Sequence, residues 1–123
     1  KQAGMMPEDI RMIHFYDDFL IAILLTLEHI GFCGRGEGSD FVLNTDLSYK
    51  GRLPLNTSGG QISAGQPGLA GGGLNLVEAV RQMFGEAGER QVSDPRNAMV
   101  TGIGVIPYGR NWSVSSVLIL EQS

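Results

Sequence analysis

Short apolar blocks, separated by polar and glycine-rich stretches, follow one another along the 123 residues of the chain. The first, residues 10–15 (IRMIHF), predicts a strand that leads out of a turn at residues 7–9. The second, residues 19–27 (FLIAILLTL), is apolar on all sides but shorter than the roughly 20 residues that cross a bilayer. We therefore expect a strand followed by a buried helix.

Capping residues mark the two ends of that helix. Asp17 or Asp18 can accept a hydrogen bond from the first turn, and Gly31 suits a left-handed C-cap, so the helix is predicted to run to about Ile30. Residues 33–52 then mix glycine with charge around a short apolar block. We expect this segment to be an excursion with little regular structure.

A second strand and helix follow the excursion. Residues 53–55 (LPL) predict a short strand, and a glycine-rich loop then leads into a helix in which apolar residues recur at helical spacing. The helical positions are Leu74, Val77, Val80 or Arg81, and Phe84, with Gly85 as the end. Residues 98–100 and 112–120 predict a final pair of strands around a turn at residues 107–109.

The predicted order of elements is β-α-(loop)-β-α-β-β. Strands that alternate with helices favour an α/β fold with parallel strands, and the adjacent final strands favour an antiparallel hairpin. Both helices are expected to pack their apolar residues against one sheet. At this length, residues 1–123 are expected to form a single domain.

Composition narrows the choice of partners. The formal net charge is −4 and lysine and arginine do not cluster, so neither nucleic acid nor membrane is an expected partner. The single cysteine leaves no disulfide framework, which favours a cytoplasmic location, and no clustered metal ligands are present. The first residues lack both a targeting pattern and an initiator Met, so the chain is predicted to begin inside a longer protein.

The glycine-rich loop, residues 59–72, reads GGQISAGQPGLAGG. Glycines at positions 59, 60, 65 and 68 allow positive φ angles and a close approach of the backbone to a ligand. Exposed N–H groups at the following helix start favour an acyl oxygen or an anionic group. From composition alone, a loop that serves only tight packing fits equally well.

Four segments in this chain resemble the C-terminal domain of the thiolase superfamily. The glycine loop resembles the superfamily pattern GGxxxxGHPxGxxG and likewise precedes a helix. The strand-to-helix turn of that domain is similar to residues 7–19, PEDIRMIHFYDDF. The sterol-carrier-protein-X and aldolase branch is similar to residues 27–38, LEHIGFCGRGEG, and the next helix of the domain is similar to residues 78–92, EAVRQMFGEAGERQV. The resemblance implies the C-terminal half of a two-domain, layered αβαβα enzyme that acts on coenzyme A thioesters, with the N-terminal catalytic half outside this chain.

The resemblance also implies two candidate catalytic residues. Tyr16 stands where ordinary thiolases have Asn or His, and Gln66 replaces the His of Gly-His-Pro. A phenol can exchange a proton, whereas a glutamine amide can only hydrogen-bond, and a tyrosine that merely closes the strand end is the structural alternative. We expect the two side chains to meet at one end of the sheet. The implied substrate-binding glycines are Gly59, Gly60, Gly65, Gly68 and Gly102.

Other reactive side chains fit the thiolase pattern poorly. Thr101 lies closest to the expected second cysteine and does not titrate usefully. Cys33 does not match the acylated cysteine, and we interpret it as a packed small hydrophobe. His14, inside an apolar strand, and His29, near a helix end, are assigned structural roles.

Three functions remain open. Retro-aldol cleavage of a β-hydroxyacyl-CoA uses tyrosines and fits Tyr16, with Tyr108 as a poorer second candidate. A 3-ketoacyl-CoA thiolase would need the missing histidine and cysteine, and a non-catalytic thiolase-like subunit would need neither. The resemblance implies that the enzyme uses no cofactor, since coenzyme A enters as part of the thioester substrate. It also implies three partners, namely the N-terminal half, a second protomer and a small OB-fold protein. The isolated chain is expected to be inactive.

Overall fold

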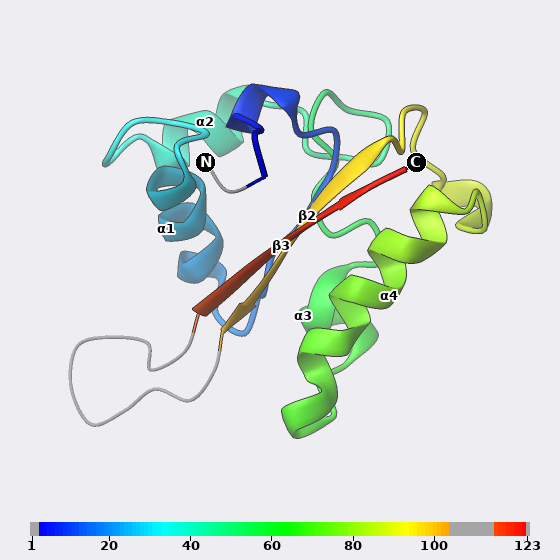
Figure 1. The fold of residues 1–123 in the computed structure, drawn as a ribbon. Coiled ribbons are helices and arrows are strands. Elements are labelled where there is room, and N and C mark those ends of the chain that lie inside the picture. The colour runs from blue at the N-terminus through cyan, green and yellow to red at the C-terminus, as the bar shows by residue number, and fades with distance from the viewer. Residues whose placement is uncertain (1–2, 104–114, 123) are drawn as a thin grey trace.

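The computed structural model describes residues 3–103 and 115–122 (Figure 1). Its helices and strands are β1 (Ile13–His14), α1 (Leu20–Ile30), α2 (Gly38–Asn44), α3 (Gly60–Ala64), α4 (Gly71–Met83), β2 (Asn97–Ile103) and β3 (Ser115–Glu121). Short 3₁₀ turns lie at Pro7–Asp9, Gly68–Ala70 and Gly88–Arg90. The first of these confirms the predicted lead into β1.

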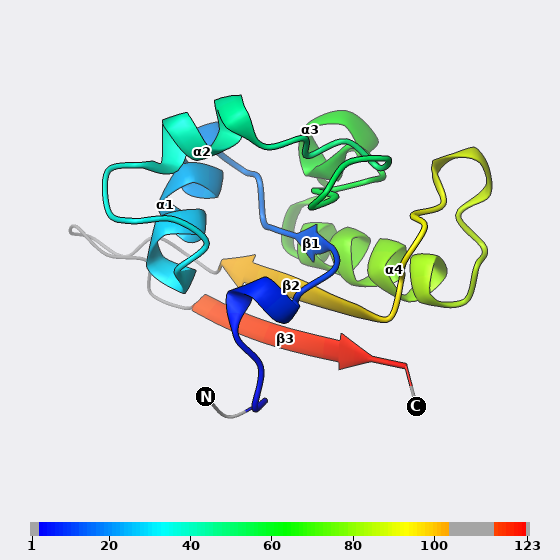
Figure 2. The ribbon, with the colours of Figure 1, turned by 90° about the horizontal axis from the view of Figure 1, so that it is seen from above.

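The strands form one sheet in the order β1-β2-β3. Strand β1 is parallel to β2, while β3 is antiparallel to β2 and lies at the outer edge of the sheet (Figure 2). The α/β class, the parallel pair and the antiparallel final pair are therefore confirmed. The predicted turn at residues 107–109, including Tyr108, lies outside the described residues.

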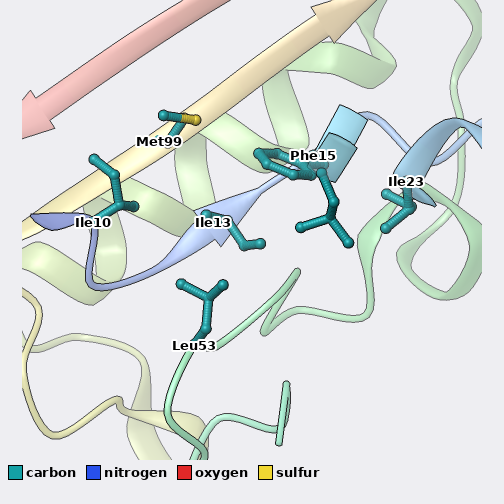
Figure 3. Packing of buried hydrophobic residues seen from close by; sticks show 7 residues of the cluster. Ile10, Ile13, Phe15, Ile23, Leu53 and Met99 are labelled. Atoms are coloured by element: carbon teal, nitrogen blue, oxygen red, sulfur yellow. The ribbon is translucent and has the colours of Figure 1, made fainter. Parts of the chain in front are cut away.

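Hydrophobic cores lie on both faces of the sheet, because successive strand residues point to opposite sides. The larger core, on the α1 face, consists of Ile10, Ile13, Phe15, Ile23, Leu27, Leu53 and Met99 (Figure 3). The smaller core consists of Met12, Ala79, Val92, Ala98 and Val100. Helices α1 and α4 thus flank one sheet from opposite sides (Figure 1).

The N-terminal end of α1 differs from the prediction. Phe19 is the N-cap and no side chain caps the first turn, so neither Asp17 nor Asp18 is the predicted N-cap. The carboxylate of Asp17 instead accepts the backbone N–H of Gln61 at 2.9 Å. The other end of α1 confirms the prediction, since Gly31 caps the helix in the left-handed conformation, with a φ of 100°.

Helix α1 is buried along one side only. Ala22, Ile23 and Leu27 are buried, whereas Leu20 and Ile21 are 72% and 58% exposed. The prediction of a wholly buried helix is wrong for this chain, because the sheet and α2 cover only part of the helix surface. Within the described residues, no helix is both long and apolar enough to cross a membrane.

Residues 33–52 contain helix α2, so the prediction of an irregular excursion is wrong there. Gly38, the first residue of α2, donates its N–H to the carboxylate of Glu28 at 2.9 Å. A Cβ at this position would lie 3.0 Å from the backbone oxygen of Leu24 in α1. The close packing of the two helices therefore depends on a residue without a side chain.

Residues 53–55 do not form the predicted strand, because only an isolated parallel bridge joins Leu55 to Ile13. Pro54 has no N–H to give to a neighbouring strand, although its carbonyl accepts the N–H of Ile13 at 2.8 Å. The glycine-rich loop that follows holds more regular structure than predicted, since it includes α3.

Helix α4 covers the predicted helical segment but turns an unexpected side toward the sheet. Val77 and Phe84 are 53% and 75% exposed. The buried side carries small and polar residues, namely Gly71, Asn75, Glu78, Ala79 and Gln82. The prediction that both helices pack their apolar residues on the sheet is wrong for α4, because its buried polar side chains find hydrogen-bond partners there.

Glu78 is the centre of this buried polar side. Its carboxylate receives two hydrogen bonds of 2.9 Å from Arg90 and one of 2.8 Å from Thr57. Gln82, one turn along the helix, bonds both to this carboxylate and to the backbone carbonyl of Arg90. Burial raises the pKa of Glu78, but hydrogen bonds from Arg90, Thr57 and Gln82 outweigh burial and keep the pKa below its ordinary value.

We expect Arg90→Met to lower the free energy of unfolding by about 3 kcal/mol, because the buried carboxylate of Glu78 would lose both hydrogen bonds from Arg90 and keep only Arg81, at 3.8 Å, as a nearby cation. Arg96→Met is the matched control, since Arg96 makes a two-bond contact with Asp94 at 2.8 Å in which both side chains are well exposed. The Arg96–Asp94 pair should contribute far less to the free energy of unfolding, because solvent screens it. Urea denaturation measures both variants, and equal losses would contradict the expectation.

His14 is a buried side chain with a different character. It is 0% exposed, and neither ring nitrogen has a hydrogen-bond partner within the described residues. Burial lowers the pKa of His14 from its ordinary value of 6.5 to about 4, and the charge of Glu78 offsets this shift only in part. The ring is therefore neutral at pH 7.

This burial predicts a loss of stability in mild acid. The unfolded chain binds the His14 proton below pH 6.5 and the folded chain only near pH 4, so stability that is present above pH 6.5 is lost as the pH falls between these values. The loss should reach about 3 kcal/mol. Urea denaturation at a series of pH values checks it. His14→Met should flatten the curve between pH 6.5 and about 5, and an unchanged slope would contradict this assignment.

Candidate functional site

The structure brings Tyr16 and Gln66 together. Tyr16 follows β1 and is half-buried, while Gln66 is exposed in the loop after α3. The Nε2 group of Gln66 donates a hydrogen bond of 2.9 Å to the phenol oxygen of Tyr16. This contact confirms the predicted proximity of the two side chains, whose catalytic roles remain predictions.

The phenol ring lies beside the start of α4. A Cβ added at Gly72 would be 3.8 Å from Cε2 of the Tyr16 ring, which is ordinary van der Waals contact. A Cβ added at Gly71 would be 3.0 Å from Cγ of Gln66. Gly71 thus lets Gln66 lie close to the helix backbone, whereas a side-chain carbon at position 72 would fit beside the Tyr16 ring.

Side chains from three segments hold the peptide group that joins Phe15 to Tyr16. The N–H of Tyr16 donates to the hydroxyl of Thr101 on β2 at 3.0 Å. The carbonyl of Phe15 accepts hydrogen bonds from the amides of Asn56 and Asn75, at 2.9 and 2.8 Å. Thr101, whose position in the sequence is closest to that of the second thiolase cysteine, therefore has a structural role, because its hydroxyl binds the peptide group of Tyr16.

The glycine loop has the predicted backbone conformation. Positive φ angles occur at Gly59, Gly60, Gly65 and Gly68. At Gly60 the reason is visible, because a Cβ there would overlap the carboxylate of Asp17. The loop therefore needs glycine at position 60 for contact with the segment between β1 and α1, whereas its role in binding substrate stays a prediction.

Gly102 is placed apart from the other predicted glycines. It lies on β2 and borders a hollow of about 270 Å³ between α1 and the β2–β3 pair, next to His29 and Ser116. Tyr16 and Gln66 are not among the residues that line this hollow. The structure thus groups Gly102 with α1 rather than with the glycine loop.

Cys33 packs against the larger core rather than against Tyr16 or Gln66. Cys33 is half-buried against the larger core, and burial, followed by the charges of Glu28 and Glu37, raises the pKa of its thiol. A raised pKa leaves less thiolate at neutral pH, in keeping with the interpretation as a packed hydrophobe. Among the residues that the structure describes, no three His, Cys, Asp or Glu side chains form a group that could hold a metal ion.

Sequence reasoning missed the residues that support the site. Asp17 or Asp18 is the cap of α1 that the sequence predicts, and the pattern assigns no role to Gln61, Asn56 or Asn75. Asn75 could not be predicted to face the sheet, because the apolar spacing in the sequence of α4 predicts the opposite side of that helix to be buried. A usable signal was the position of Asp17 directly after Tyr16, since a buried carboxylate beside a candidate site residue requires hydrogen-bond donors nearby.

Comparisons with known proteins identify relatives of this chain. The chain is 42% identical over 110 residues to "Steroid side-chain-cleaving aldolase" of Thermomonospora curvata, covering 88% of this chain and 27% of that protein. It is 38% identical over 105 residues to human "Sterol carrier protein 2", a match that covers 85% of this chain and 19% of that protein. It is also 38% identical over 110 residues to "17-hydroxy-3-oxo-4-pregnene-20-carboxyl-CoA lyase" of Mycobacterium tuberculosis, a match that covers 88% of this chain and 27% of that protein.

A solved structure is similar as well. The "Ltp2-ChsH2(DUF35) aldolase" superimposes with a TM-score of 0.73 at 40% identity, covering 81% of this chain and 25% of that chain. The chain thus spans between about a fifth and a quarter of the length of these relatives. The family model described as "Thiolase C-terminal domain-like" matches residues 1–122, so the chain belongs to the thiolase C-terminal domain-like family.

Proposed function

We propose that this chain is the C-terminal domain of a thiolase-superfamily enzyme that cleaves a β-hydroxyacyl-CoA by a retro-aldol reaction in lipid or steroid side-chain metabolism. The observation that carries the proposal is the 2.9 Å hydrogen bond from Gln66 to the phenol of Tyr16. Relatives named as a steroid side-chain-cleaving aldolase and as a carboxyl-CoA lyase support the same reaction class.

A retro-aldol cleavage requires two proton transfers. A base removes the proton of the β-hydroxyl group, the Cα–Cβ bond breaks, and its electrons pass to the α-carbon as a thioester enolate. An acid then protonates that carbon, which gives a carbonyl compound and a shortened acyl-CoA. The reaction uses no acylated cysteine, so a proton-transfer group is the essential requirement.

Tyr16 meets this requirement on chemical grounds. Its oxygen accepts a hydrogen bond from Gln66, which leaves the phenol O–H available to donate to a substrate oxygen or carbon. The same bond would stabilise the charge left on the phenol oxygen once the proton is given up. An amide nitrogen carries two N–H groups, so Gln66 can hold Tyr16 with one and donate to the substrate with the other.

A 3-ketoacyl-CoA thiolase is the second candidate. It is favoured by the match of residues 1–122 to the family model described as "Thiolase C-terminal domain-like". A thiolase needs a base that activates a cysteine, and Gln66 cannot take a proton at neutral pH as an imidazole can. A non-catalytic subunit is the third candidate, in which the Tyr16–Gln66 contact is purely structural.

The proposal includes partners for the exposed apolar side of α4. Phe84 and Val77 remain 75% and 53% exposed. Phe84 also lines a hollow of about 430 Å³, together with Val80, Met83 and Leu120. Apolar patches of this kind mark contact surfaces. We propose that the N-terminal half of the parent protein covers this side, and that a homodimer and a small OB-fold partner complete the enzyme. The solved relative named Ltp2-ChsH2(DUF35) aldolase supports a second protein.

We expect Tyr16→Phe to reduce turnover of a β-hydroxyacyl-CoA by the full-length protein on the order of 100-fold or more, because the ring is kept and only the proton-transfer group is lost. Gln66→Ala should cost about 10-fold, the equivalent of one hydrogen bond. Steady-state kinetics measures both. Tyr49→Phe, a tyrosine that packs against the smaller core, is the matched control and should keep nearly full activity.

A second assay separates the reaction classes. The full-length protein is incubated with a β-hydroxyacyl-CoA, or with a 3-ketoacyl-CoA plus free CoA, before and after thiol alkylation. Cleavage of the β-hydroxyacyl-CoA that survives alkylation is the expected outcome. Turnover of the ketoacyl substrate alone, abolished by the reagent, would favour the thiolase, and no turnover of either would favour the non-catalytic subunit. A Cys33→Ala background ensures that this thiol does not decide the result.

A further inference from the structure

Asp17 and Gln61 form a reciprocal contact directly beside Tyr16. The N–H of Asp17 donates to the side-chain oxygen of Gln61 at 3.0 Å, and the N–H of Gln61 donates to the Asp17 carboxylate at 2.9 Å. The second carboxylate oxygen accepts the N–H of Ile62 at 3.4 Å. Because Asp17 and Gln61 are only 4% and 3% exposed, solvent competes little for these bonds.

Gln61 also closes the base of the segment that carries Gln66. Its side-chain Nε2 group donates to the backbone carbonyl of Gly71 at 3.0 Å, and its backbone carbonyl accepts the N–H of Gly65 at 3.0 Å. One residue therefore fixes both the entry to residues 62–70 and the exit from them. Gln66 lies in the middle of this closed segment, and its side chain meets Tyr16.

The two contacts connect into one chain of hydrogen bonds. Tyr16 and Asp17 are adjacent in sequence, Asp17 holds Gln61, and Gln61 holds both ends of the segment that presents Gln66. Gly60 permits the approach, since any Cβ there would overlap the Asp17 carboxylate. The Tyr16–Gln66 contact is thus set by groups that lie behind it and away from solvent.

We propose that Asp17 and Gln61 are positioning residues that set the place of Gln66 relative to the phenol of Tyr16. For its effect on turnover this inference rests on the proposed function, because the gain from positioning exists only if Tyr16 and Gln66 act on a substrate. A displacement of about 1 Å at a reacting group can cost 100-fold in rate. Loss of the Gln61 side-chain bonds should therefore reach the reaction through Gln66.

The variant that tests the proposal is Gln61→Met, which keeps the side-chain volume and removes both amide hydrogen bonds. Gln91→Met is the matched control. Gln91 accepts the N–H of Ala87 at 3.1 Å and donates to the carbonyl of Gln82 at 2.8 Å, so it makes the same two kinds of bond at the far end of α4. Asp17→Asn is a second variant, which keeps the shape of the side chain and replaces one carboxylate oxygen by a donor.

In the full-length protein we expect Gln61→Met to lower kcat by up to about 10-fold, no more than Gln66→Ala does, with little change in KM, and Gln91→Met to leave both within about twofold. In a Gln66→Ala background, Gln61→Met should cause no further loss, because the group it positions is already absent. A merely structural residue would lower kcat by the same factor in both backgrounds, and that result would overturn the proposal.

Hydrogen exchange followed by mass spectrometry gives a readout that needs no activity. Gln61→Met and Asp17→Asn should speed backbone exchange in residues 60–72 and leave α1 and β2 unchanged. If Tyr16→Phe proves fully active, the proposed function fails, and this measurement alone decides the positioning role. Unchanged exchange in residues 60–72, or faster exchange across the whole chain in both variants, would overturn it.

Discussion

The structure depends on how the peptide groups just beyond β1 are hydrogen-bonded. Strand β1 contains only two residues, so the backbone that continues it has no long strand partner. Side chains take that place: Asn56 and Asn75 bond to the carbonyl of Phe15, and Thr101 bonds to the N–H of Tyr16. Buried peptide groups must be satisfied, and here polar side chains from distant segments satisfy them. The site residue that follows the strand is therefore held by the same bonds that hold the fold together.

This arrangement explains the polar interior of α4. Asn75 must reach the end of β1, and Glu78 must reach Arg90 and Thr57, so the side of α4 that faces the sheet is rich in hydrogen-bonding groups. The apolar residues of the helix consequently point outward, where Phe84 is 75% exposed. An outward apolar stripe agrees with a domain that spans only about a fifth to a quarter of the length of its relatives.

Much of the fold could be predicted from local patterns. The helix that ends at Gly31 and the antiparallel final strands follow from capping and alternation, which are short-range signals. The meeting of Tyr16 with Gln66, 50 positions apart, follows from the position of each residue in a motif of the family. The capping role of Asp17 was predicted for the wrong helix. The local pattern favours a bond from its carboxylate to the start of α1, but the approach of Gly60 on a distant segment gives it the N–H groups of Gln61 and Ile62 instead.

Local patterns in the sequence are enough to predict helices α1 and α4, the strands of the sheet and the pair Tyr16 and Gln66, but not helices α2 and α3. Which side of α4 is buried and how the site is supported depend on tertiary packing. Asp17 and Gln61 are 44 positions apart, and Phe15 and Asn75 are 60 apart, so no periodic pattern within one element records these pairs. The physical reason is that the free energy of a buried polar group depends on its partner, and that partner is set by the packing of distant segments.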